Sequence, residues 1–279
     1  MKSHQWQCGR YRIPLDRPLV MGILNVTPDS FSDGGLHAEP LEALAHARAM
    51  MAAGAGMVDV GGESTRPGAR PVQTTEELAR VRPVVARLAA EGSVPVSVDT
   101  RHAEVARACV DAGAAVINDV TGFRDPEMIR VAAGCDAGLV VMHMLGDDPQ
   151  TMQLEPRYDD VVAEVSEFLG EQARRLQDAG VARERIALDP GMGFGKTFAH
   201  NIELFRRLPE IAALGYPVLM GASRKRFIGH IFGEEDPARR VAGSVGAAVT
   251  AYLRGADVLR VHDVAETTQA LEVAATIGR

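Results

Sequence analysis

Eight short apolar runs recur along the chain, and segments with helical periodicity separate them. Each run carries aliphatic or β-branched side chains at nearly every position, as expected of parallel strands that are buried on both faces. Strands that alternate with helices in this way predict either a closed (β/α)8 barrel or an open, doubly wound sheet. The runs are LVMGIL (19–24), MVDV (57–60), VPVSV (94–98), AAVI (114–117), GLVVM (138–142), RIAL (185–188), PVLM (217–220) and DVLRV (257–261).

Polar residues follow every run at its C-terminal end, and this pattern separates the two architectures. An open sheet gathers its ligand contacts at one switch point, whereas a barrel gathers them from all its strand ends on one face. The residues are Asn25, the turn at 61–66, Asp99, Asn118, His143, Asp189, the segment 223–225 and the pair 262–263. The presence of such residues after all eight runs favours a (β/α)8 TIM barrel.

The barrel is expected to be a single domain. No linker, low-complexity stretch or change of composition divides residues 19–279, and a total of 279 residues is an ordinary length for such a barrel. Residues 1–18 precede the first run and contain Trp6, Tyr11 and Ile13. We expect this segment to form a short hairpin that closes the bottom of the barrel.

Two of the intervening helices carry clear sequence signals. Thr74 and Glu77 have the spacing of a capping box, while Pro83 is expected to kink or split the helix that follows. Residues 158–179 carry apolar side chains at helical intervals, and the pattern ends at Gly180. Both segments fit helices that connect parallel strands on the outside of a barrel.

Net charge and cysteine content limit the classes of function. The formal charge of −7 argues against nucleic acid as the main partner, because that partner usually demands a basic face. A local cluster of Arg and Lys still permits an anionic substrate. Three scattered cysteines without a CxxC pair fit a reducing compartment. Since the sequence shows no apolar signal region and no transmembrane stretch, we expect a soluble cytoplasmic protein that binds neither nucleic acid nor membrane.

The segment DPGMGFGKT (189–197) raises the question of nucleotide binding, since it combines alternating glycines with a Gly-Lys-Thr ending. A P-loop requires four residues between its first glycine and the Gly-Lys pair, but only three separate Gly191 from Gly195. Asp189 also places a carboxylate where phosphate would be repelled. The P-loop hypothesis is therefore weak, and two interpretations stay open. Asp189 binds a ligand, or it caps the next helix with Pro190 in the first turn.

Seven motifs occur together, in an order that matches one enzyme family. They are NVTPDSFSDGG (25–35), GGESTRPGA (61–69), SVDT (97–100), INDVTG (117–122), DPGMGFGK (189–196), GASRKRFIG (221–229) and RVHDV (260–264). Motif for motif, and over the whole chain after the first dozen residues, the sequence resembles dihydropteroate synthase. The resemblance implies a pterin-binding barrel that joins p-aminobenzoate to 6-hydroxymethyl-7,8-dihydropterin diphosphate and releases diphosphate in folate biosynthesis. It also implies that sulfonamides target the protein.

The resemblance implies three groups of site residues, which overlap in part. It assigns Asp189 to pterin, and a carboxylate suits that role because it can accept two parallel hydrogen bonds from the pterin amino group and ring N–H. The pterin contacts are Asp99, Asn118, Met142, Asp189, Gly193, Phe194, Gly221 and Lys225. The diphosphate contacts are Asn25, Arg66, Arg260 and His262. The p-aminobenzoate contacts are Phe31, Thr65, Pro67, Ser223 and Lys225.

The same resemblance implies Mg²⁺ as the cofactor, held through the side-chain oxygen of Asn25. One protein ligand is sufficient, because Mg²⁺ usually keeps several waters and takes further ligands from substrate phosphate. No carboxylate cluster with metal-ligand spacing is evident elsewhere in the sequence. We expect an SN1-like displacement in which the protein stabilises the leaving diphosphate and the pterin cation, without a general base. The catalytic residues are Asp99, Lys225, Arg260 and His262.

Other interpretations stay open. A polar strand-end residue can simply satisfy local backbone groups, and the Arg-x-His pair (260–262) can form a salt bridge with Asp263 or Glu266. A methyltransferase that uses methyltetrahydrofolate would share the pterin aspartates and asparagine, but it has no use for the SRK, RVH and NVTPDSFSDGG motifs. A non-catalytic paralogue would be expected to have lost loop residues or to have replaced Lys225 or Arg260, and none of them is lost.

Two further features concern surfaces. Residues 238–253 include small side chains at 242–244 and 246–248, a face that permits close packing of helices. The resemblance favours a homodimer at this face over packing against the barrel. The segment MLGDDPQTMQ (144–153) departs from the family, which often carries a basic residue and no paired acids there. Asp147 and Asp148 leave the role of that loop open.

Overall fold

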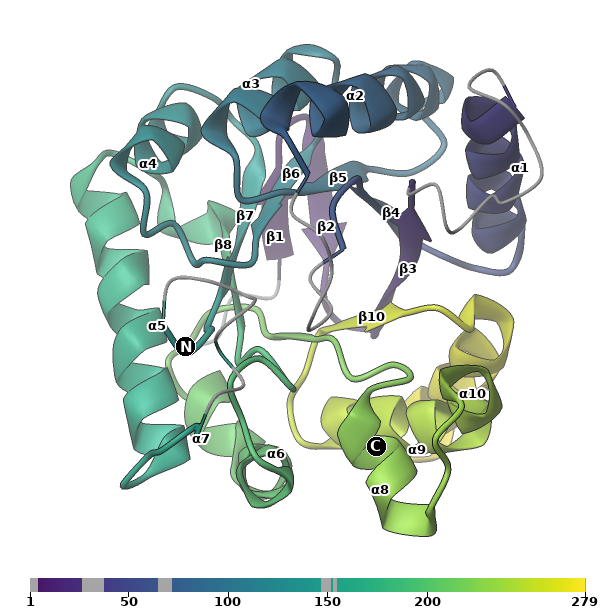
Figure 1. Ribbon diagram of the computed structural model, residues 1–279, viewed down its shortest axis with the longest axis vertical. Helices are drawn as coiled ribbons and strands as arrows, with labels where there is room; N and C mark the ends of the chain where they lie inside the picture. The colour runs from purple at the N-terminus through teal and green to yellow at the C-terminus, as the bar shows by residue number, and fades with distance from the viewer. Residues whose placement is uncertain (1–4, 27–37, 65–71, 147–151, 153–154, 279) are drawn as a thin grey trace.

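Eight parallel strands form a barrel surrounded by helices in the computed structural model (Figure 1). The structure describes residues 5–26, 38–64, 72–146, 152 and 155–278. The barrel strands are β3 (Leu19–Asn25), β4 (Met57–Gly61), β5 (Val96–Asp99), β6 (Val116–Asp119), β7 (Gly138–Met142), β8 (Ile186–Asp189), β9 (Leu219–Met220) and β10 (Val258–Val261). Each apolar run of the sequence overlaps one of these strands, so the predicted TIM barrel is confirmed.

Strand pairing brings the carboxyl ends of all the strands to one face. Neighbouring strands follow the order β8-β7-β6-β5-β4-β3-β10-β9, and a parallel bridge between Leu188 and Val218 joins the two edges. The register places Gly61 beside both Asn25 and Asp99. The polar residues that follow each strand in the sequence therefore meet at this face, which is where barrels of this type bind their ligands.

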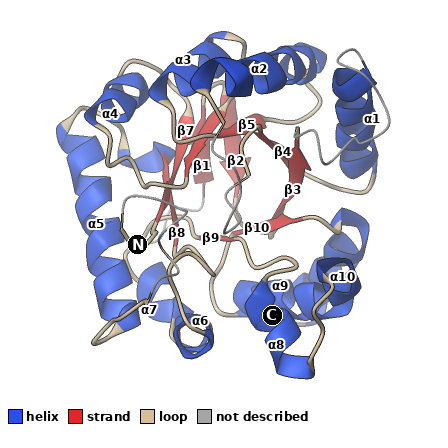
Figure 2. Cartoon of the chain, in the orientation of Figure 1, coloured by secondary structure: helices blue, strands red, loops and turns tan. Residues whose placement is uncertain are grey.

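The helices cover the outside of the barrel (Figure 2). Their inner faces pack with outward-facing strand residues in one continuous core, to which Val85, Leu169 and Leu271 belong. The helices are α1 (Ala38–Ala52), α2 (Thr74–Glu91), α3 (Ala103–Asp111), α4 (Pro126–Ala133), α5 (Val161–Asp178), α6 (Phe198–Arg206), α7 (Leu208–Ala212), α8 (Arg226–Phe232), α9 (Val241–Leu253) and α10 (Val264–Ile277). Two 3-10 turns, η2 (Arg183–Arg185) and η3 (Pro237–Arg240), precede β8 and α9.

The capping-box prediction for Thr74 and Glu77 is wrong. α2 begins at Thr74, but its N-cap is Gln73, and no side chain caps the helix. Glu77 turns inward instead: its side chain is fully buried, and Oε2 lies 2.6 Å from His102 Nδ1. A tertiary partner has replaced the local one, which the spacing of residues along one helix cannot reveal.

The other helix predictions are confirmed in part. The segment 158–179 contains α5, and its N-cap Asp160 accepts hydrogen bonds from two backbone N–H groups of the first turn. Pro83 does not split α2, which continues past it to Glu91. Proline removes only one helical hydrogen bond. The valines around it, among them Val84, are buried and hold both halves of the helix against the barrel.

An antiparallel hairpin packs against the amino end of the barrel, and the predicted hairpin is thereby confirmed. Its strands, β1 (Gln5–Cys8) and β2 (Tyr11–Pro14), pair Trp6 with Ile13. The Trp6 side chain is fully buried, and its Nε1 donates to the Arg185 carbonyl oxygen at 2.9 Å. An apolar cluster fills this end, which we call the amino-end plug: Trp6, Cys8, Ile13, Leu15, Met21, Met57, Ala115, Val116, Val140, Ala187, Leu219 and Val258.

Candidate active site

The carboxyl ends of the strands bring four of the predicted site residues together. Asp99 ends β5, Asn118 lies in β6, Asp189 ends β8 and Arg260 lies in β10. Asn118 and Asp189 are buried, whereas the side chains of Asp99 and Arg260 keep 22% and 19% of their surface exposed. Because these groups are largely removed from water, their charges interact more strongly than they would at the protein surface.

Arg260 joins two carboxylates at the centre of this cluster. Its Nε donates to Asp59 Oδ2 at 2.6 Å, and its Nη2 donates to Asp99 Oδ2 at 2.6 Å. The Asn118 side-chain amide donates to the same oxygen of Asp59 at 3.1 Å. These bonds tie β10 to β4, β5 and β6 across the interior, and they fix the plane of the guanidinium group.

Burial dominates the protonation equilibria of the cluster. It raises the pKa of Asp99 to about 7, although Arg260 acts in the opposite direction, and it also raises the pKa of Asp189. Burial by itself would lower the pKa of Arg260, but the charges of Asp59 and Asp99 outweigh it, and this pKa is raised. The guanidinium therefore stays charged and pairs with both carboxylates.

The salt bridge considered for the Arg-x-His pair at 260–262 does not form. Asp263 is paired with Arg224, whose Nε donates to Asp263 Oδ2 at 3.0 Å, while Arg260 is bound to the two carboxylates described above. His262 has a different partner. Its Nδ1 lies 3.0 Å from Ser223 Oγ, and its backbone N–H donates to that oxygen at 3.2 Å. Ser223 thus orients His262.

Lys225 faces the same cluster from the start of α8. Its Nζ lies 4.5 Å from the centre of the Phe194 ring and also donates to the Met192 carbonyl oxygen. Burial lowers the pKa of Lys225 to about 8, and the charge of Asp189 offsets part of this effect. The Lys225 ammonium group and the flat Phe194 ring, both predicted pterin contacts, therefore lie next to each other.

The loop at 189–196 requires glycine where it crosses the end of β7. Asp189 Oδ1 accepts a hydrogen bond from the Gly191 N–H at 2.7 Å. Gly191 has φ of +66°, and a Cβ atom there would lie 1.8 Å from the His143 carbonyl oxygen. Any other residue would collide with the backbone. The next helix, α6, is capped by Thr197, so the helix-cap interpretation of Asp189 is wrong.

Lys196 points into the protein and not toward a phosphate site. Its Nζ donates to the Phe194 carbonyl oxygen at 3.1 Å and lies 2.8 Å from His143 Nδ1. Burial lowers the pKa of Lys196 and lowers that of His143 to about 2. A P-loop lysine must reach the β- and γ-phosphates of a nucleotide. With its lysine buried, the 189–197 segment cannot act as a P-loop.

The remaining predicted pterin contacts lie around these charged groups. Gly193 donates its backbone N–H to Asn201 Oδ1 at 2.7 Å. At Gly221, a Cβ atom would lie 3.9 Å from both Asp189 Oδ2 and Arg260 Cβ, so this glycine separates the two side chains. The predicted apolar wall belongs to a small cluster of its own: Val120, Met142, Met144 and Met152, with Phe194 packed against them.

Asn25 is the predicted metal ligand. It ends β3, its side chain is half-buried, and its neighbour in the register is Gly61. Gly61 leaves the space between Asn25 and Asp99 free of a side chain. An amide oxygen is a hard donor of the kind that Mg²⁺ prefers, and one such ligand suits an ion that takes the rest of its shell from phosphate and water. The residue present at this position therefore fits a magnesium ion.

The structure also gathers a second set of metal-ligand types that the linear sequence separates. Glu63, Glu77 and His102 offer ligand atoms within 4.8 Å of one another, so the expectation of no such cluster is wrong. Arg101, however, donates to both oxygens of Glu63, at 2.9 and 3.0 Å. A guanidinium at this distance opposes a bound cation. The cluster is better explained as an ion-pair network beside the loop that follows β4.

Some predicted residues lie outside the described part of the chain. They are Phe31, Thr65, Arg66 and Pro67 of the predicted substrate contacts, together with Asp147 and Asp148. Their roles stay predictions. The motifs did not single out one residue of the cluster: Asp59 lies inside the run MVDV and is fully buried. A carboxylate within an otherwise apolar strand was the signal that could have revealed it.

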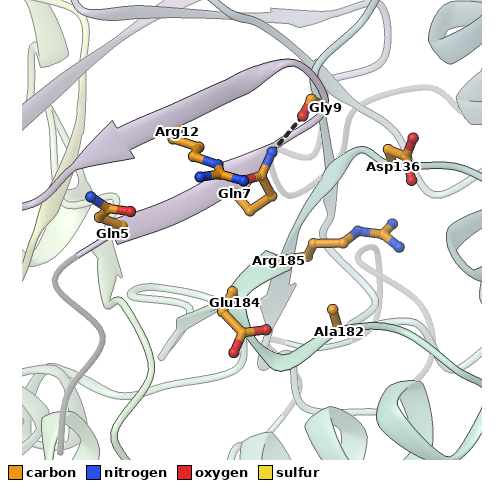
Figure 3. A pocket seen from close by; sticks show the side chains of 8 residues that line it. All are labelled: Gln5, Gln7, Gly9, Arg12, Asp136, Ala182, Glu184 and Arg185. Atoms are coloured by element: carbon orange, nitrogen blue, oxygen red, sulfur yellow. Dashed lines mark hydrogen bonds between the residues drawn. The ribbon is translucent and has the colours of Figure 1, made fainter.

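Two cavities lie away from this cluster. One, of about 690 Å³, lies at the amino end of the barrel between the hairpin and η2 (Figure 3), with Gln7, Arg12 and Glu184 in its lining. Arg185 lies at its edge, but its guanidinium donates to main-chain carbonyl oxygens. The other, of about 570 Å³, lies between α5 and α6. Neither is lined by a predicted site residue.

Known proteins share both this fold and these motifs. The pterin binding enzyme family matches residues 21–262. The dihydropteroate synthase of Neisseria meningitidis serogroup C is 49% identical over 282 residues, which cover 100% of this chain and 99% of that relative. The chain belongs to the dihydropteroate synthase family. Within the described residues, no helix has the length and apolar character needed to cross a membrane.

Solved structures of the dihydropteroate synthase family have the same architecture over their full length. The Xanthomonas albilineans enzyme with 4-aminobenzoic acid matches with a TM-score of 0.93 and 50% identity, covering 99% of both chains. The Burkholderia cenocepacia enzyme complexed with 7,8-dihydropteroate matches with a TM-score of 0.91 and 47% identity, covering 100% of this chain and 98% of that chain. The family inferred from the seven motifs is therefore confirmed.

Proposed function

We propose that the protein is a transferase that condenses p-aminobenzoate with 6-hydroxymethyl-7,8-dihydropterin diphosphate, giving 7,8-dihydropteroate and diphosphate in folate biosynthesis. The observation that carries this function is the convergence of Asp99, Asn118, Asp189 and Lys225 on one face of the barrel, around Arg260. Relatives with nearly half of their residues identical bear the name of this enzyme. One solved relative is complexed with the product, 7,8-dihydropteroate.

The pterin half of the substrate is assigned to the rigid strand ends. Asp189 offers carboxylate oxygen to the pterin amino group and ring N–H, and Asn118 offers both a donor and an acceptor to the edge of the ring. Lys225 donates to the pterin carbonyl oxygen. Met142 and Phe194 provide the apolar faces, and Gly193 and Gly221 allow the ring to approach the backbone. Burial of Asp189 supports this assignment, since a desolvated carboxylate gains most from such partners.

The diphosphate half is assigned to Asn25, Arg66, Arg260 and His262. Arg260 is held by two carboxylates and stays charged, and His262 is oriented by Ser223. Both residues come from the end of β10, where alternate positions share one face of the strand. Mg²⁺, held by Asn25, would neutralise charge on the leaving diphosphate. In this assignment, Arg260 and His262 also stabilise the negative charge of the leaving diphosphate.

The reaction is an SN1-like displacement. The bond between the pterin methylene and the diphosphate oxygen breaks first, and the electron pair leaves with diphosphate. The dihydropterin nitrogens delocalise the positive charge, and Asp99 stabilises the cation electrostatically. The aniline nitrogen of p-aminobenzoate then forms the new C–N bond and loses a proton to solvent or to diphosphate. Since the aniline is already nucleophilic, no protein base is assigned.

The p-aminobenzoate pocket is assigned to Phe31, Thr65 and Pro67, which lie outside the described residues, together with Ser223 and Lys225. Ser223 already bonds to His262, so this residue would connect the two substrate sites. A sulfonamide has the aniline ring and an acidic group in place of the carboxylate. It is therefore expected to compete with p-aminobenzoate and not with pterin.

The test is diphosphate release together with formation of dihydropteroate. Purified protein should release diphosphate only when the pterin diphosphate, p-aminobenzoate and a divalent cation are all present. Chelation of the cation should abolish turnover, and a sulfonamide should raise the KM for p-aminobenzoate without changing kcat. Equal phosphate or diphosphate release from ATP or GTP, without pterin, would refute the proposed function. Methyl transfer from methyltetrahydrofolate would support the methyltransferase alternative instead.

We also propose a homodimer that forms at α8, α9 and α10. The small-residue face of α9 divides in the structure: Ser244 and Ala248 pack inward, while Ala242 and Gly246 are exposed. Large apolar side chains are exposed nearby, at Ile231, Phe232, Leu253, Val273 and Ile277. Light scattering at micromolar concentration should give twice the 29.8 kDa mass of the chain. A mass of one chain at all concentrations would contradict the dimer.

A cytoplasmic location is proposed on two grounds. All three cysteines, Cys8, Cys109 and Cys135, are free thiols, and the first two are buried. Free thiols persist in reducing compartments, where disulfides are rare. The reaction also needs a pterin diphosphate, which carries several charges, and such a molecule does not cross membranes unaided. Detection of the protein in a fractionated cell extract would test the location directly.

A further inference from the structure

Asp59 contacts two predicted substrate-binding residues at the floor of the site. It comes from β4, its side chain is fully buried, and one of its oxygens, Oδ2, accepts hydrogen bonds from both Arg260 Nε and Asn118 Nδ2. The remaining contact of this group leads outward, since Arg260 Nη2 bonds to Asp99, which is more exposed than Asp59. Asp59 therefore occupies the innermost position of a network whose outer members face the substrates.

The remaining oxygen of Asp59 lacks a partner within the described residues. Asp59 Oδ1 is buried without a hydrogen bond, and so is Ser97 Oγ, which belongs to the residue opposite Asp59 in the register of β4 and β5. A buried, unsatisfied carboxylate oxygen destabilises a fold. An aliphatic side chain would suit this layer of the barrel better, because the next inward layer is the apolar amino-end plug. Stability alone does not explain a carboxylate at this position.

The position of Asp59 explains how Arg260 is aimed. A guanidinium with one carboxylate partner can rotate about that contact, whereas bonds from Nε to Asp59 and from Nη2 to Asp99 fix both its position and its plane. The two carboxylates come from the neighbouring strands β4 and β5 and accept from different nitrogens of the group. The Asn118 amide is oriented at the same time, because its Nδ2 is committed to Asp59 and its oxygen is left for other donors.

We propose that Asp59 is a positioning residue for the dihydropteroate synthase reaction, which holds Arg260, and with it Asn118, in the orientation that binds the pterin diphosphate. This inference rests on the proposed function. Asp59 does not itself touch substrate; it acts through two residues that do. The pKa of Arg260 supports the same picture: burial would lower it, but Asp59 and Asp99 raise it, so the guanidinium remains charged.

The experiment compares Asp59→Ala and Asp59→Asn in steady-state kinetics of dihydropteroate formation. Breaking a buried charged pair has a large effect, so kcat/KM for the pterin diphosphate should fall at least about 100-fold in Asp59→Ala. In Asp59→Asn the side-chain amide oxygen can still accept from Arg260, and the loss should be about tenfold. The KM for p-aminobenzoate should change less than about threefold in both variants. If either variant had wild-type kcat/KM for the pterin diphosphate, the inference would be overturned.

Repeating Asp59→Ala in a protein that already carries Arg260→Met tests whether Asp59 acts by positioning Arg260 or by a general effect on the fold. Asp59 acts mainly through Arg260, so Asp59→Ala should cost about tenfold less in that background than in the wild type. A loss of equal size in both backgrounds would show that Asp59 acts independently of Arg260, and would overturn the inference. Asp59→Asn keeps the shape of the side chain and serves the same comparison if Asp59→Ala does not fold.

Ser97→Ala is the matched control. It changes a buried polar side chain in the same layer of the barrel, but the Ser97 hydroxyl bonds to none of the site residues in the described structure. Its kcat/KM should stay within about twofold of the wild-type value. Losses in Ser97→Ala as large as those in Asp59→Ala would refute a specific role for Asp59. A wild-type protein that forms no dihydropteroate would instead refute the proposed function itself, whatever the variants do.

Discussion

The two ends of the barrel interior use the same strands for opposite purposes. On β6, Val116 belongs to the amino-end plug, while Asn118, two residues further on, belongs to the charged cluster. The same step of two residues separates plug from site on β8 and on β10. The pairs are Ala187 with Asp189 and Val258 with Arg260. Alternate residues of a strand point the same way, so both members of each pair face the interior.

This difference shows how the protein accommodates buried charge. The amino end gains stability from apolar burial and a tryptophan whose N–H is satisfied. At the carboxyl end, Asp59, Asp99 and Asp189 are partly or fully removed from water, and among the described residues Arg260 and Lys225 face them. Such clusters stabilise a fold weakly and serve mainly to bind or react. Changes at the two ends should therefore affect different measurements.

The largest expected effect is at the amino end. Trp6→Ala should lower the free energy of unfolding by about 3–5 kcal/mol, because it leaves a cavity in the plug and removes the bond to the Arg185 carbonyl oxygen. Urea unfolding measures this loss, and Trp6→Phe, which keeps most of the apolar volume, should show a smaller one. The KM for the pterin diphosphate should not change in the folded variant. A raised KM would mean that the two ends are coupled.

Asp189→Asn, at the carboxyl end, should have the opposite pattern of effects: weaker substrate binding without a loss of stability. It replaces one acceptor oxygen with a donor, so pterin binding should weaken by about 2–4 kcal/mol in calorimetry. Burial raises the pKa of Asp189, which means that its ionised form is disfavoured in the folded state. Above the ordinary carboxyl pKa, the variant should therefore be no less stable to urea than the wild type. Asp136→Asn, an exposed carboxylate at the amino-end cavity, is the control. Unchanged pterin affinity would remove Asp189 from the site.

A smaller effect should appear in the pH dependence. Burial lowers the pKa of Lys225 to about 8, so this lysine loses its charge on the alkaline side of that value. Above pH 8, kcat/KM for the pterin diphosphate should fall about tenfold per pH unit. Lys225→Arg keeps its charge throughout, so its residual activity should show no such limb. Trp6→Phe, at the other end, should retain the wild-type profile. If kcat/KM still fell above pH 8 in Lys225→Arg, the fall would have to come from another titrating group.

Much of the fold and part of the site could be predicted from the sequence. Apolar runs of four to six residues predicted the strands, because parallel strands in a barrel are buried on both faces. The polar residues after these runs were predicted to meet, because parallel strands all end on the same side. The requirement for glycine at position 191 did not follow from the motif, because it arises from the His143 carbonyl oxygen at the end of another strand. Local spacing failed at Glu77, where a capping box was predicted, because the half-buried His102 offered a partner that no pattern within one helix contains.

The sequence by itself thus determined most of the side chains that the site contains, whereas the tertiary structure determined which of them bond to one another. Arg260 bonds to Asp59 and Asp99 across 201 and 161 residues of chain. Which carboxylates it meets depends on strand order, register and closure of the barrel, and these are properties of eight strands together. Asp59 looked like one residue of an apolar strand. The strand order, which places β4 and β10 on either side of β3, brings it within 2.6 Å of Arg260, and this pairing offsets the cost of burying its charge.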